Sequence, residues 1–481
     1  MQQQNQKNNG FQDDKKFKAY QILAFMTTAL LYTSFHSART AWAYSKKEIE
    51  TDDYFNDRML SFLDISFMLS YAGGLFYNGW LGDQINLRNF LTQGGLLSVF
   101  GFCFFAFLSV RRMHNILIYC SLFLLFGYGQ SRGFPGSMAV LGNWIGNTNR
   151  GLLIGVWNIS VNLGNIIGQQ VGKVLIHIEH FHWSVLIFVV GGFMLAMTIF
   201  TFFFMKTHPR EVGFTPEKKL VPSQFPSKED DEDNEHSPND EPVLDSIEQV
   251  SQTSNKLEAE TETGIGFFEA WKTKGLVRYA LIYACIKGAT YGILFWLPNY
   301  LQTIIGFGSE SANISATYEF GQFCGAVALG YWSDKRGKRC FILMLSLYIA
   351  SIVFIGIAML GRGSSAWIFA GLLYLSGFFF GGPEVIVGGA IASDLGENQA
   401  LNHNSRAIST ITGIIDGTGS IGAAIVQLLI PILKSHSFYF YFSLSVCAAI
   451  LCTPLALKEN RTPPPDINKQ DKKIVLGNLE V

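Results

Sequence analysis

The sequence predicts an all-α membrane protein in which twelve transmembrane helices form two pseudo-symmetric six-helix bundles. Three observations predict it: a composition poor in charge, two long apolar regions separated by a polar segment, and features that recur in both regions. Of the 481 residues, 49% are hydrophobic and 15% are charged, whereas ordinary soluble domains are about 25% charged. The mean hydropathy is +0.23. A soluble globule cannot bury so much apolar surface, which disfavours a soluble enzyme.

Charge and motif content exclude several other classes of function. The formal net charge of -1 gives no basic surplus for binding nucleic acid. The seven cysteines lie in or beside apolar runs without paired spacing, so we expect neither a disulfide framework nor a zinc cluster. The sequence has no P-loop, nucleophile elbow or metalloprotease motif. We therefore expect no enzyme and no cofactor, and any transport has to draw on gradients or exchange.

Three polar segments divide the chain. Residues 1–16 are rich in Gln, Asn and Lys and lack the apolar core of a signal peptide, so we expect a disordered N-terminal tail. Residues 207–274 contain an acidic run at 229–235 and predict a disordered linker. Residues 458–481 predict a polar C-terminal tail.

The two remaining regions, 17–206 and 275–457, are each long enough for six spans of ~20 apolar residues. The expected spans lie near residues 20–43, 60–80, 90–110, 115–143, 151–175 and 183–205, and near 275–302, 311–333, 340–360, 366–392, 407–433 and 437–457. An even number of spans places both termini and the linker on the same side of the bilayer. The tail and short loops on that side hold eleven Lys and Arg against six on the other, so the positive-inside rule predicts cytoplasmic termini.

Features of the first half recur in the second half at nearly one offset. A Gly-x-x-small-Asp loop with a basic end follows the second span at Asp83 and the eighth span at Asp334, an offset of 251. Prolines interrupt the fourth and tenth spans at an offset of 248. Glycines at four-residue spacing on the fifth and eleventh spans let helix backbones approach closely. Duplicated halves joined by a linker indicate a two-bundle transporter with a midplane site between the halves.

Charged residues within the spans locate the expected site. A charged side chain near the bilayer centre costs roughly 2.5–3.5 kcal/mol on insertion scales, so each is expected to have a partner or a watery cavity. Arg39 in the first span and Lys287 in the seventh are also 248 positions apart, which makes them equivalent residues of the two halves. The hydropathy of the first span places Arg39 near its outer end, but the repeat places it at mid-depth. We give priority to the repeat.

Two converging cations without an evident anion between them predict a phosphate site, because guanidinium offers a planar fork of donors and ammonium a compact charge. Tyr32 and His36 share a helix face with Arg39, and Tyr291 lies one turn from Lys287. Aromatic hydroxyls beside cations suit the sugar end of a phosphorylated sugar. These five residues form the predicted substrate-binding site.

The other intramembrane charges leave alternatives open. One alternative is that carboxylates neutralise Arg39 and Lys287 and merely tie helices together. The available carboxylates are Asp64, Glu319, Asp416 and Glu384. We favour the ligand role, since intramembrane ionisable residues are functional by default, and treat the first three of these carboxylates as structural or gating residues. Arg132 is either a third cation of the substrate site or one member of a structural pair.

The repeated loops resemble the signature of the major facilitator superfamily, in which the loop charges meet neighbouring helix ends and help hold one conformation. This resemblance implies structural or gating roles for Asp83, Arg88, Asp334 and Arg339. Longer matches resemble the sugar phosphate exchangers of solute carrier family 37, which are organophosphate:phosphate antiporters. The segments that carry this second resemblance are 32–39, 63–83, 130–135, 142–144, 150–165, 295–298, 393–396 and 414–422.

The resemblance implies the major facilitator fold and exchange of a phosphorylated sugar, commonly glucose 6-phosphate, for inorganic phosphate, often across the endoplasmic reticulum membrane. It matches Arg39 and Lys287 to cations of the family's first and seventh helices, and Asn158, in a matched segment, joins the predicted substrate-binding residues. The chain departs from the family at Thr40, where a lysine is usual, and near Ser160, where a histidine is missing. The expected partners are a phosphorylated sugar, inorganic phosphate and bilayer lipid; the sequence indicates no nucleic acid and no particular protein partner.

Two other hypotheses stay open. A proton-linked transporter of another small solute would use Asp64, Glu319 or Glu384 as its proton carrier. A non-transporting receptor or scaffold would recruit partners through the acidic linker. A scaffold needs no matched cations in mid-membrane, so we rank it below both transporters.

Overall fold

The computed structural model describes residues 2–51, 54–82, 85–144, 156–214, 270–392, 395 and 405–461, and all of the regular structure in these residues is helical. Helices are the expected outcome for apolar spans, because the bilayer offers no water to backbone N–H and C=O groups and each must be satisfied within its own segment.

Each of the twelve predicted spans coincides with helix. In the first half these are α1 Gln2–Glu50, α2 Asp57–Gly82, α3 Leu87–Val110, α4 Ile116–Gln130, α5 Gly133–Trp144, α7 Ile159–Gly172 and α8 Trp183–Phe204. In the second half they are α11 Leu276–Tyr300, α12 Ser311–Arg336, α13 Arg339–Ala358, α14 Ala366–Val385, α16 Ser405–Leu433 and α17 Ser437–Arg461. Short π or 3₁₀ segments follow or precede them: η2 Lys173–Ile178, η3 Pro209–Val212, η4 Leu301–Ile305, η5 Gly308–Glu310, η6 Ile386–Ile391 and η7 Lys434–His436.

Seven helical segments of the described chain are long and apolar enough to cross a bilayer; the full count of twelve spans stays a prediction. The fourth span is divided into α4 and α5, and Pro135 lies in the first turn of α5, where a missing N–H costs no intrahelical bond. The first helix is longer than predicted. It begins at Gln2, within the expected tail, and continues to Glu50, so Arg39 lies inside the helix rather than at its outer end.

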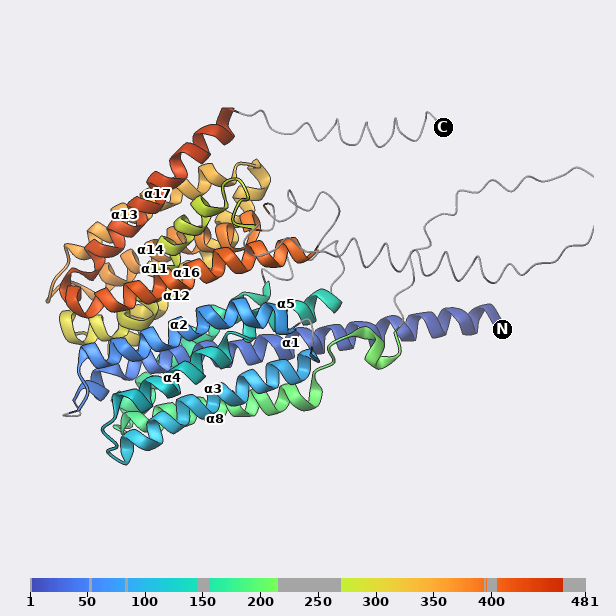
Figure 1. Cartoon of the computed structure of the whole chain (residues 1–481), viewed down its shortest axis with the longest axis horizontal. Helices are drawn as coiled ribbons and strands as arrows, with labels where there is room; N and C mark the ends of the chain where they lie inside the picture. Colours follow the sequence, from blue (N-terminus) through green and yellow to red (C-terminus); the bar gives the residue numbers. More distant parts are fainter. Residues whose placement is uncertain are drawn as a thin grey trace, which may run out of the picture.

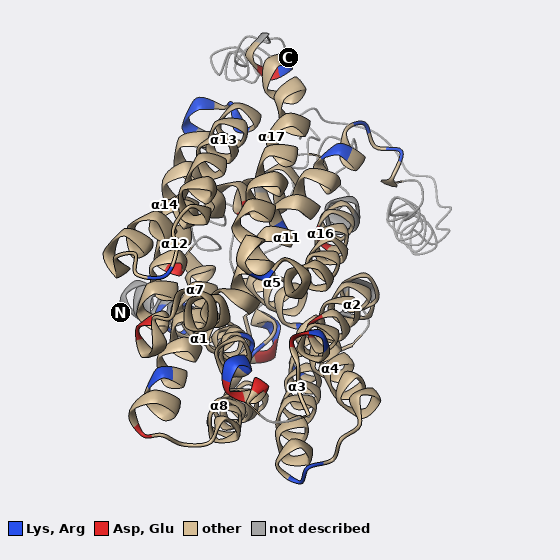
Figure 2. Cartoon of the chain, turned by 90° about the vertical axis from the view of Figure 1, so that its left-hand side faces the viewer, with Lys and Arg blue, Asp and Glu red and all other residues tan. Residues whose placement is uncertain are grey.

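The two halves of the chain lie side by side (Figure 1). The helices of the first half, coloured blue to green, pack together, and those of the second half, yellow to red, cover one side of them. The halves meet where α2 packs on α16, α1 on α11 and α7 on α12. In the end-on view, charged residues gather mainly at helix ends and connections (Figure 2). The exterior presents large apolar side chains such as Trp367, Leu117 and Ile352, exposed by 86%, 74% and 72%, a surface suited to lipid.

Glycines on α7 bring its backbone against α1. A Cβ at Gly164 would overlap the Thr33 carbonyl, and one at Gly168 would overlap the Ser37 carbonyl. The hydroxyl of Thr33 donates to the Ser160 carbonyl at 3.2 Å across the same contact. The small-residue ridge read from the sequence therefore holds α1, which carries Arg39, in a fixed position.

This contact predicts that Gly168→Ala destabilises the protein, because overpacking a tight interface costs about 1–3 kcal/mol. Gly192→Ala in α8 is the matched control, since a Cβ there has no neighbour within 4 Å. The measurement is the melting temperature of the detergent-solubilised protein. Equal melting temperatures for the two variants would contradict close packing of α1 on α7.

Candidate substrate-binding site

Arg39 of α1 and Lys287 of α11 meet at the interface between the halves. The Arg39 Cζ lies 4.9 Å from the ring centre of Tyr71 and 5.9 Å from that of Tyr291. The Lys287 Nζ lies 5.5 Å from each of the same two ring centres. The structure thus brings the two equivalent cations onto one pair of aromatic rings, as their shared offset in the sequence predicts.

Arg39 is fully buried, yet one of its donors is unused. Its Nε donates to Gln130 Oε1 at 2.5 Å and its Nη1 donates to the Tyr291 hydroxyl at 2.8 Å. Its Nη2 is buried and has no hydrogen-bond partner in the described part of the chain. A buried charge is costly unless it is paired and its donors are satisfied, and among the described residues this guanidinium has no carboxylate partner.

Lys287 differs from the sequence-based expectation. Its Nζ lies 2.5 Å from Asp416 Oδ1 on α16 and donates to Ser420 Oγ at 2.8 Å. The expectation that neither cation has a nearby anion is therefore wrong for Lys287. The reason is that α11 packs closely on α16, which places the Asp416 carboxylate beside the ammonium group. Lys287 therefore has a carboxylate partner, whereas Arg39 has none among the described residues.

A second polar network joins the halves close to Arg39. His36 Nδ1 lies 3.1 Å from Asn165 Oδ1, and Asn165 Nδ2 donates to Glu319 Oε2 at 2.8 Å. Because Asn165 Oδ1 only accepts, His36 carries its proton on Nδ1. The other ring nitrogen, His36 Nε2, is buried without a partner among the described residues. Tyr32, one turn earlier, stacks on Trp157 with ring centres 4.9 Å apart.

The sequence did not predict the Lys46–Asp64 ion pair. Lys46 lies beyond the expected first span, 20–43, and is counted among the loop cations of the outer side. Both side chains are fully buried, with Nζ 2.5 Å from Oδ2, and Trp42 Nε1 donates to the other carboxylate oxygen at 2.7 Å. Asp64 therefore serves Lys46 and is not a counter-ion for Arg39. The seven-residue spacing from Arg39 to Lys46, which puts both on one helix face, is the signal that could have found the pair.

Other predicted residues lie elsewhere. Arg132 donates to Gln93 Oε1 at 3.0 Å and to the Tyr128 hydroxyl at 3.4 Å, so its contacts are with α3 and α4 and not with the partners of Arg39. Asn158 is half-buried at the start of α7 and makes no capping bond.

Only some of the charged residues of the two repeated loops have side chains that the structure describes. Arg88 lies in the first turn of α3, with its Cζ 6.0 Å from the Phe202 ring centre, and Arg339 begins α13. Asp83 lies outside the described residues, and Asp334 belongs to α12 but its side chain is outside them.

The halves are bound together at the end of the molecule far from the N-terminus. Lys434, after α16, forms an ion pair with Asp57 at the start of α2, and Ser61 Oγ donates to the Gln427 carbonyl at 2.5 Å. Lys46 Nζ lies 4.0 Å from the Trp296 ring centre. These contacts join the α1–α2 corner to the ends of α11 and α16.

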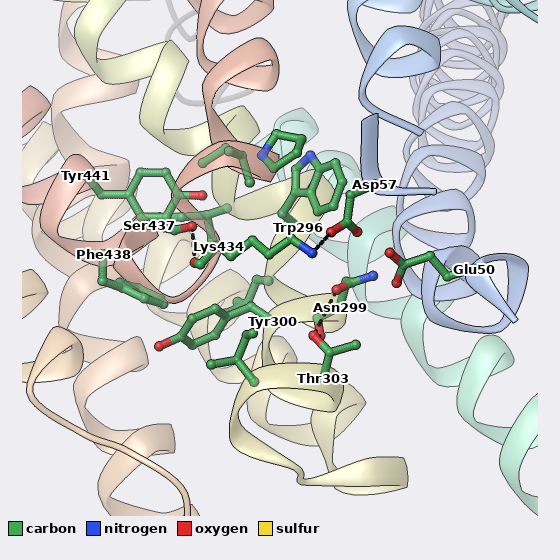
Figure 3. Close-up of a pocket in the computed structure, with 15 residues that line it drawn as sticks. Glu50, Asp57, Trp296, Asn299, Tyr300, Thr303, Lys434, Ser437, Phe438 and Tyr441 are labelled. Carbon is green, nitrogen blue, oxygen red and sulfur yellow. Dashed lines mark hydrogen bonds and ion pairs between the residues drawn. The ribbon is translucent and has the colours of Figure 1, made fainter. Parts of the chain in front are cut away.

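A cavity of about 110 Å³ lies at this end of the molecule. Figure 3 shows Lys434 reaching Asp57 across the cavity, with Glu50 of α1 opposite Asn299 of α11. Aromatic rings from the second half, including Tyr300 and Tyr441, line it. The residues that line this cavity do not include Arg39, Lys287 or the two rings on which they lie.

The comparisons with known proteins decide the family. The sequence profile of the Major Facilitator Superfamily matches residues 19–426, and Sugar phosphate exchanger 3 of Mus musculus is 31% identical over 92% of this chain and 94% of its own. The chain belongs to the sugar phosphate exchanger family of the Major Facilitator Superfamily. A glucose-6-phosphate exchanger of Xenopus tropicalis is also 31% identical, over 88% of this chain and 84% of its own.

Two solved structures have the same fold. A bacterial homologue of the human lysosomal transporter Spinster, in an inward-facing and unoccupied conformation, has a TM-score of 0.64 at 15% identity and covers 92% of this chain and 99% of its own. A D-xylose-proton symporter has a TM-score of 0.66 at 10% identity and covers 90% and 97%. Membership of this family identifies the protein as a membrane transporter and not an enzyme. The sequence predicts the same.

The Lys46–Asp64 pair yields a stability prediction. Asp64→Ala leaves a buried ammonium without a partner and is expected to cost about 3–5 kcal/mol, whereas replacing both residues, as Lys46→Met with Asp64→Leu, costs much less. Lys173→Ala is the control, because its pairing with Glu310 at 3.4 Å is partly exposed and such pairs contribute about 0–1 kcal/mol. Thermal melting in detergent measures all three. A double variant as unstable as Asp64→Ala would contradict the assignment.

Proposed function

We propose that this transporter exchanges a phosphorylated sugar of the glucose 6-phosphate type for inorganic phosphate by alternating access. One observation carries the proposal: the buried Arg39 guanidinium has no carboxylate partner in the described residues, its Nη2 donor is unused, and it lies on the same two aromatic rings as Lys287. A phosphate group supplies the oxygens that such a fork of donors binds. The names of the Mus musculus and Xenopus tropicalis relatives, a sugar phosphate exchanger and a glucose-6-phosphate exchanger, support the same class of cargo.

When the cargo binds, Lys287 exchanges its partner Asp416 for the phosphate group. Its ammonium has three donors and sits on the same two rings as Arg39, and the Asp416 side chain remains 21% exposed. A phosphate held by Arg39 Nη2 competes with Asp416 for Lys287 and draws the two halves together. The sugar end then faces His36 Nε2 and the Tyr32 ring.

The charge of Arg39 explains exchange. In the empty carrier this buried charge has no anion beside it, so the intermediate closed on both sides is penalised. A bound anion cancels it, and the bundles 17–206 and 275–457 can then rock about the site. In this proposal the end joined by Lys434 and Asp57 is the closed side of the carrier, and the side of the termini is the one that opens. With the termini on the cytoplasmic side this is the inward-facing state, in our proposal within the endoplasmic reticulum membrane.

The first test is phosphate counterflow in reconstituted vesicles. Arg39→Ala is expected to lower the exchange rate at least 100-fold, and Arg39→Lys at least tenfold because the planar fork is lost, losses of about 2.8 and 1.4 kcal/mol. Arg112→Ala, an exposed arginine in the turn after α3, is the control and is expected to retain exchange. Undiminished counterflow in Arg39→Ala would reject the proposal.

The second test separates a ligand role of Lys287 from simple neutralisation of Asp416. Lys287→Ala alone leaves the partly exposed Asp416 carboxylate unpaired and is expected to be inactive under either interpretation. The double variant Lys287→Ala with Asp416→Ala removes both charges. We expect it to stay inactive in phosphate counterflow, because the cargo loses a cation. Recovery of exchange in the double variant would mean that Lys287 only neutralises Asp416.

A further inference from the structure

The side chain of Gln130, the last residue of α4, links two points on α1. Its Oε1 accepts a hydrogen bond from Arg39 Nε at 2.5 Å, and its Nε2 donates to the Phe35 carbonyl at 3.2 Å. Phe35 and Arg39 are one helical turn apart, and Gln130 is fully buried. The amide has one possible direction here, because a guanidinium only donates and a carbonyl only accepts. The amide oxygen therefore faces the cation.

This link lies within one half of the molecule. The hydrogen bond from Arg39 Nε goes to Gln130 of the same half, whereas the bond from Nη1 goes to Tyr291 of α11, across the interface. The rocking of the halves proposed above changes the distance from Arg39 to Tyr291 and leaves the distance to Gln130 unchanged. Gln130 is thus placed to hold the guanidinium in one direction through the whole transport cycle.

Gln130 differs in charge from the acceptor beside the other central cation. Lys287 donates to the carboxylate of Asp416, whereas the acceptor at Arg39 Nε is a neutral amide. A glutamate at position 130 would have nearly the same shape as the glutamine and would form an ion pair with the guanidinium, which strengthens the hydrogen bond. The neutral amide orients Arg39 without supplying it with a negative charge.

We propose that Gln130 is a positioning residue that keeps Arg39 available for an anion, because its amide fixes the direction of the guanidinium and leaves the positive charge uncompensated. A carboxylate in its place would hold Arg39 equally well, but an incoming phosphate group would then meet a like charge at the site. An apolar residue would leave the charge uncompensated and its direction free. This inference rests on the proposed function of the same site.

Two substitutions separate orientation from charge, and their stabilities are expected to differ. Gln130→Glu keeps the bond to Arg39 Nε and strengthens it by charge. It loses the bond to the Phe35 carbonyl, but within the continuous helix α1 that oxygen still accepts from the backbone N–H four residues later. We expect Gln130→Glu without ligand to melt at least as high as the wild type. Gln130→Leu leaves Arg39 Nε buried without an acceptor and is expected to melt lower.

The response to phosphate is expected to follow the opposite order. Inorganic phosphate is titrated against the melting temperature of the detergent-solubilised protein at constant pH and ionic strength. The half-saturating phosphate concentration is expected to rise roughly tenfold or more in Gln130→Glu, and by a smaller factor in Gln130→Leu, which retains the uncompensated charge. A residue that only tied the helices together would give the same order in both measurements, with Gln130→Leu the more impaired variant in each.

Gln93→Glu is the matched control. Gln93 of α3 also accepts a hydrogen bond from an arginine, Arg132, at 3.0 Å, and the hydrogen-bond partners of Arg132 differ from those of Arg39. This variant adds the same negative charge to the same half and is expected to respond to phosphate as the wild type does. An unchanged response in Gln130→Glu, or an equal loss in Gln93→Glu, would overturn the inference.

The stability of Gln130→Glu is itself decisive. If this variant melts below Gln130→Leu or does not fold, the carboxylate does not pair with Arg39 and the inference is overturned. The two proposals fail differently. A wild type that neither is stabilised by phosphate nor shows phosphate counterflow rejects the proposed exchange, whereas equal responses of the wild type and Gln130→Glu reject only the role of Gln130.

Discussion

The structure depends on a buried positive charge, that of Arg39, which has no carboxylate partner among the described residues. Arg39 lies at the interface of the two halves, fully enclosed, and spends two donors on Gln130 and Tyr291 while a third is unused. In a low-dielectric interior a charge of this kind is tolerated only with a partner. The surrounding elements either hold the guanidinium in place or control access to it, and this is the arrangement that a carrier for an anion needs.

The supporting structure separates permanent charge pairs from exchangeable ones. Lys46 and Asp64 are fully buried and held by Trp42, so they fix the α1–α2 corner in both loaded and empty carriers. Lys434 and Asp57 join the halves at an exposed rim, where water can replace either partner when this side of the carrier opens. Lys287 and Asp416 are intermediate, because the carboxylate is partly exposed and the ammonium lies on the same rings as Arg39. The more buried an ion pair is, the less readily it exchanges its partners.

Much of this architecture follows from the sequence, since apolar length fixes the helices and the repeated offset identifies Arg39 and Lys287 as equivalent residues. The family is also readable from the ordered motifs. The sequence could not predict which side chain pairs with each charged residue inside the bundle. Whether Asp416 faces Lys287 depends on how α11 packs on α16. Lys46 reads as a loop residue unless α1 is known to continue to Glu50. The alignment of His36, Asn165 and Glu319 across three helices has no local signature at all.

The central claim is that Arg39 binds the phosphate group of the cargo, and ligand-induced thermal stabilisation of the detergent-solubilised protein tests it most directly. A ligand that binds the folded state raises the melting temperature by mass action. The account predicts that inorganic phosphate and glucose 6-phosphate stabilise the wild type, that free glucose does not, and that Arg39→Ala loses both responses. Stabilisation of Arg39→Ala by phosphate to the same extent as the wild type would contradict the account.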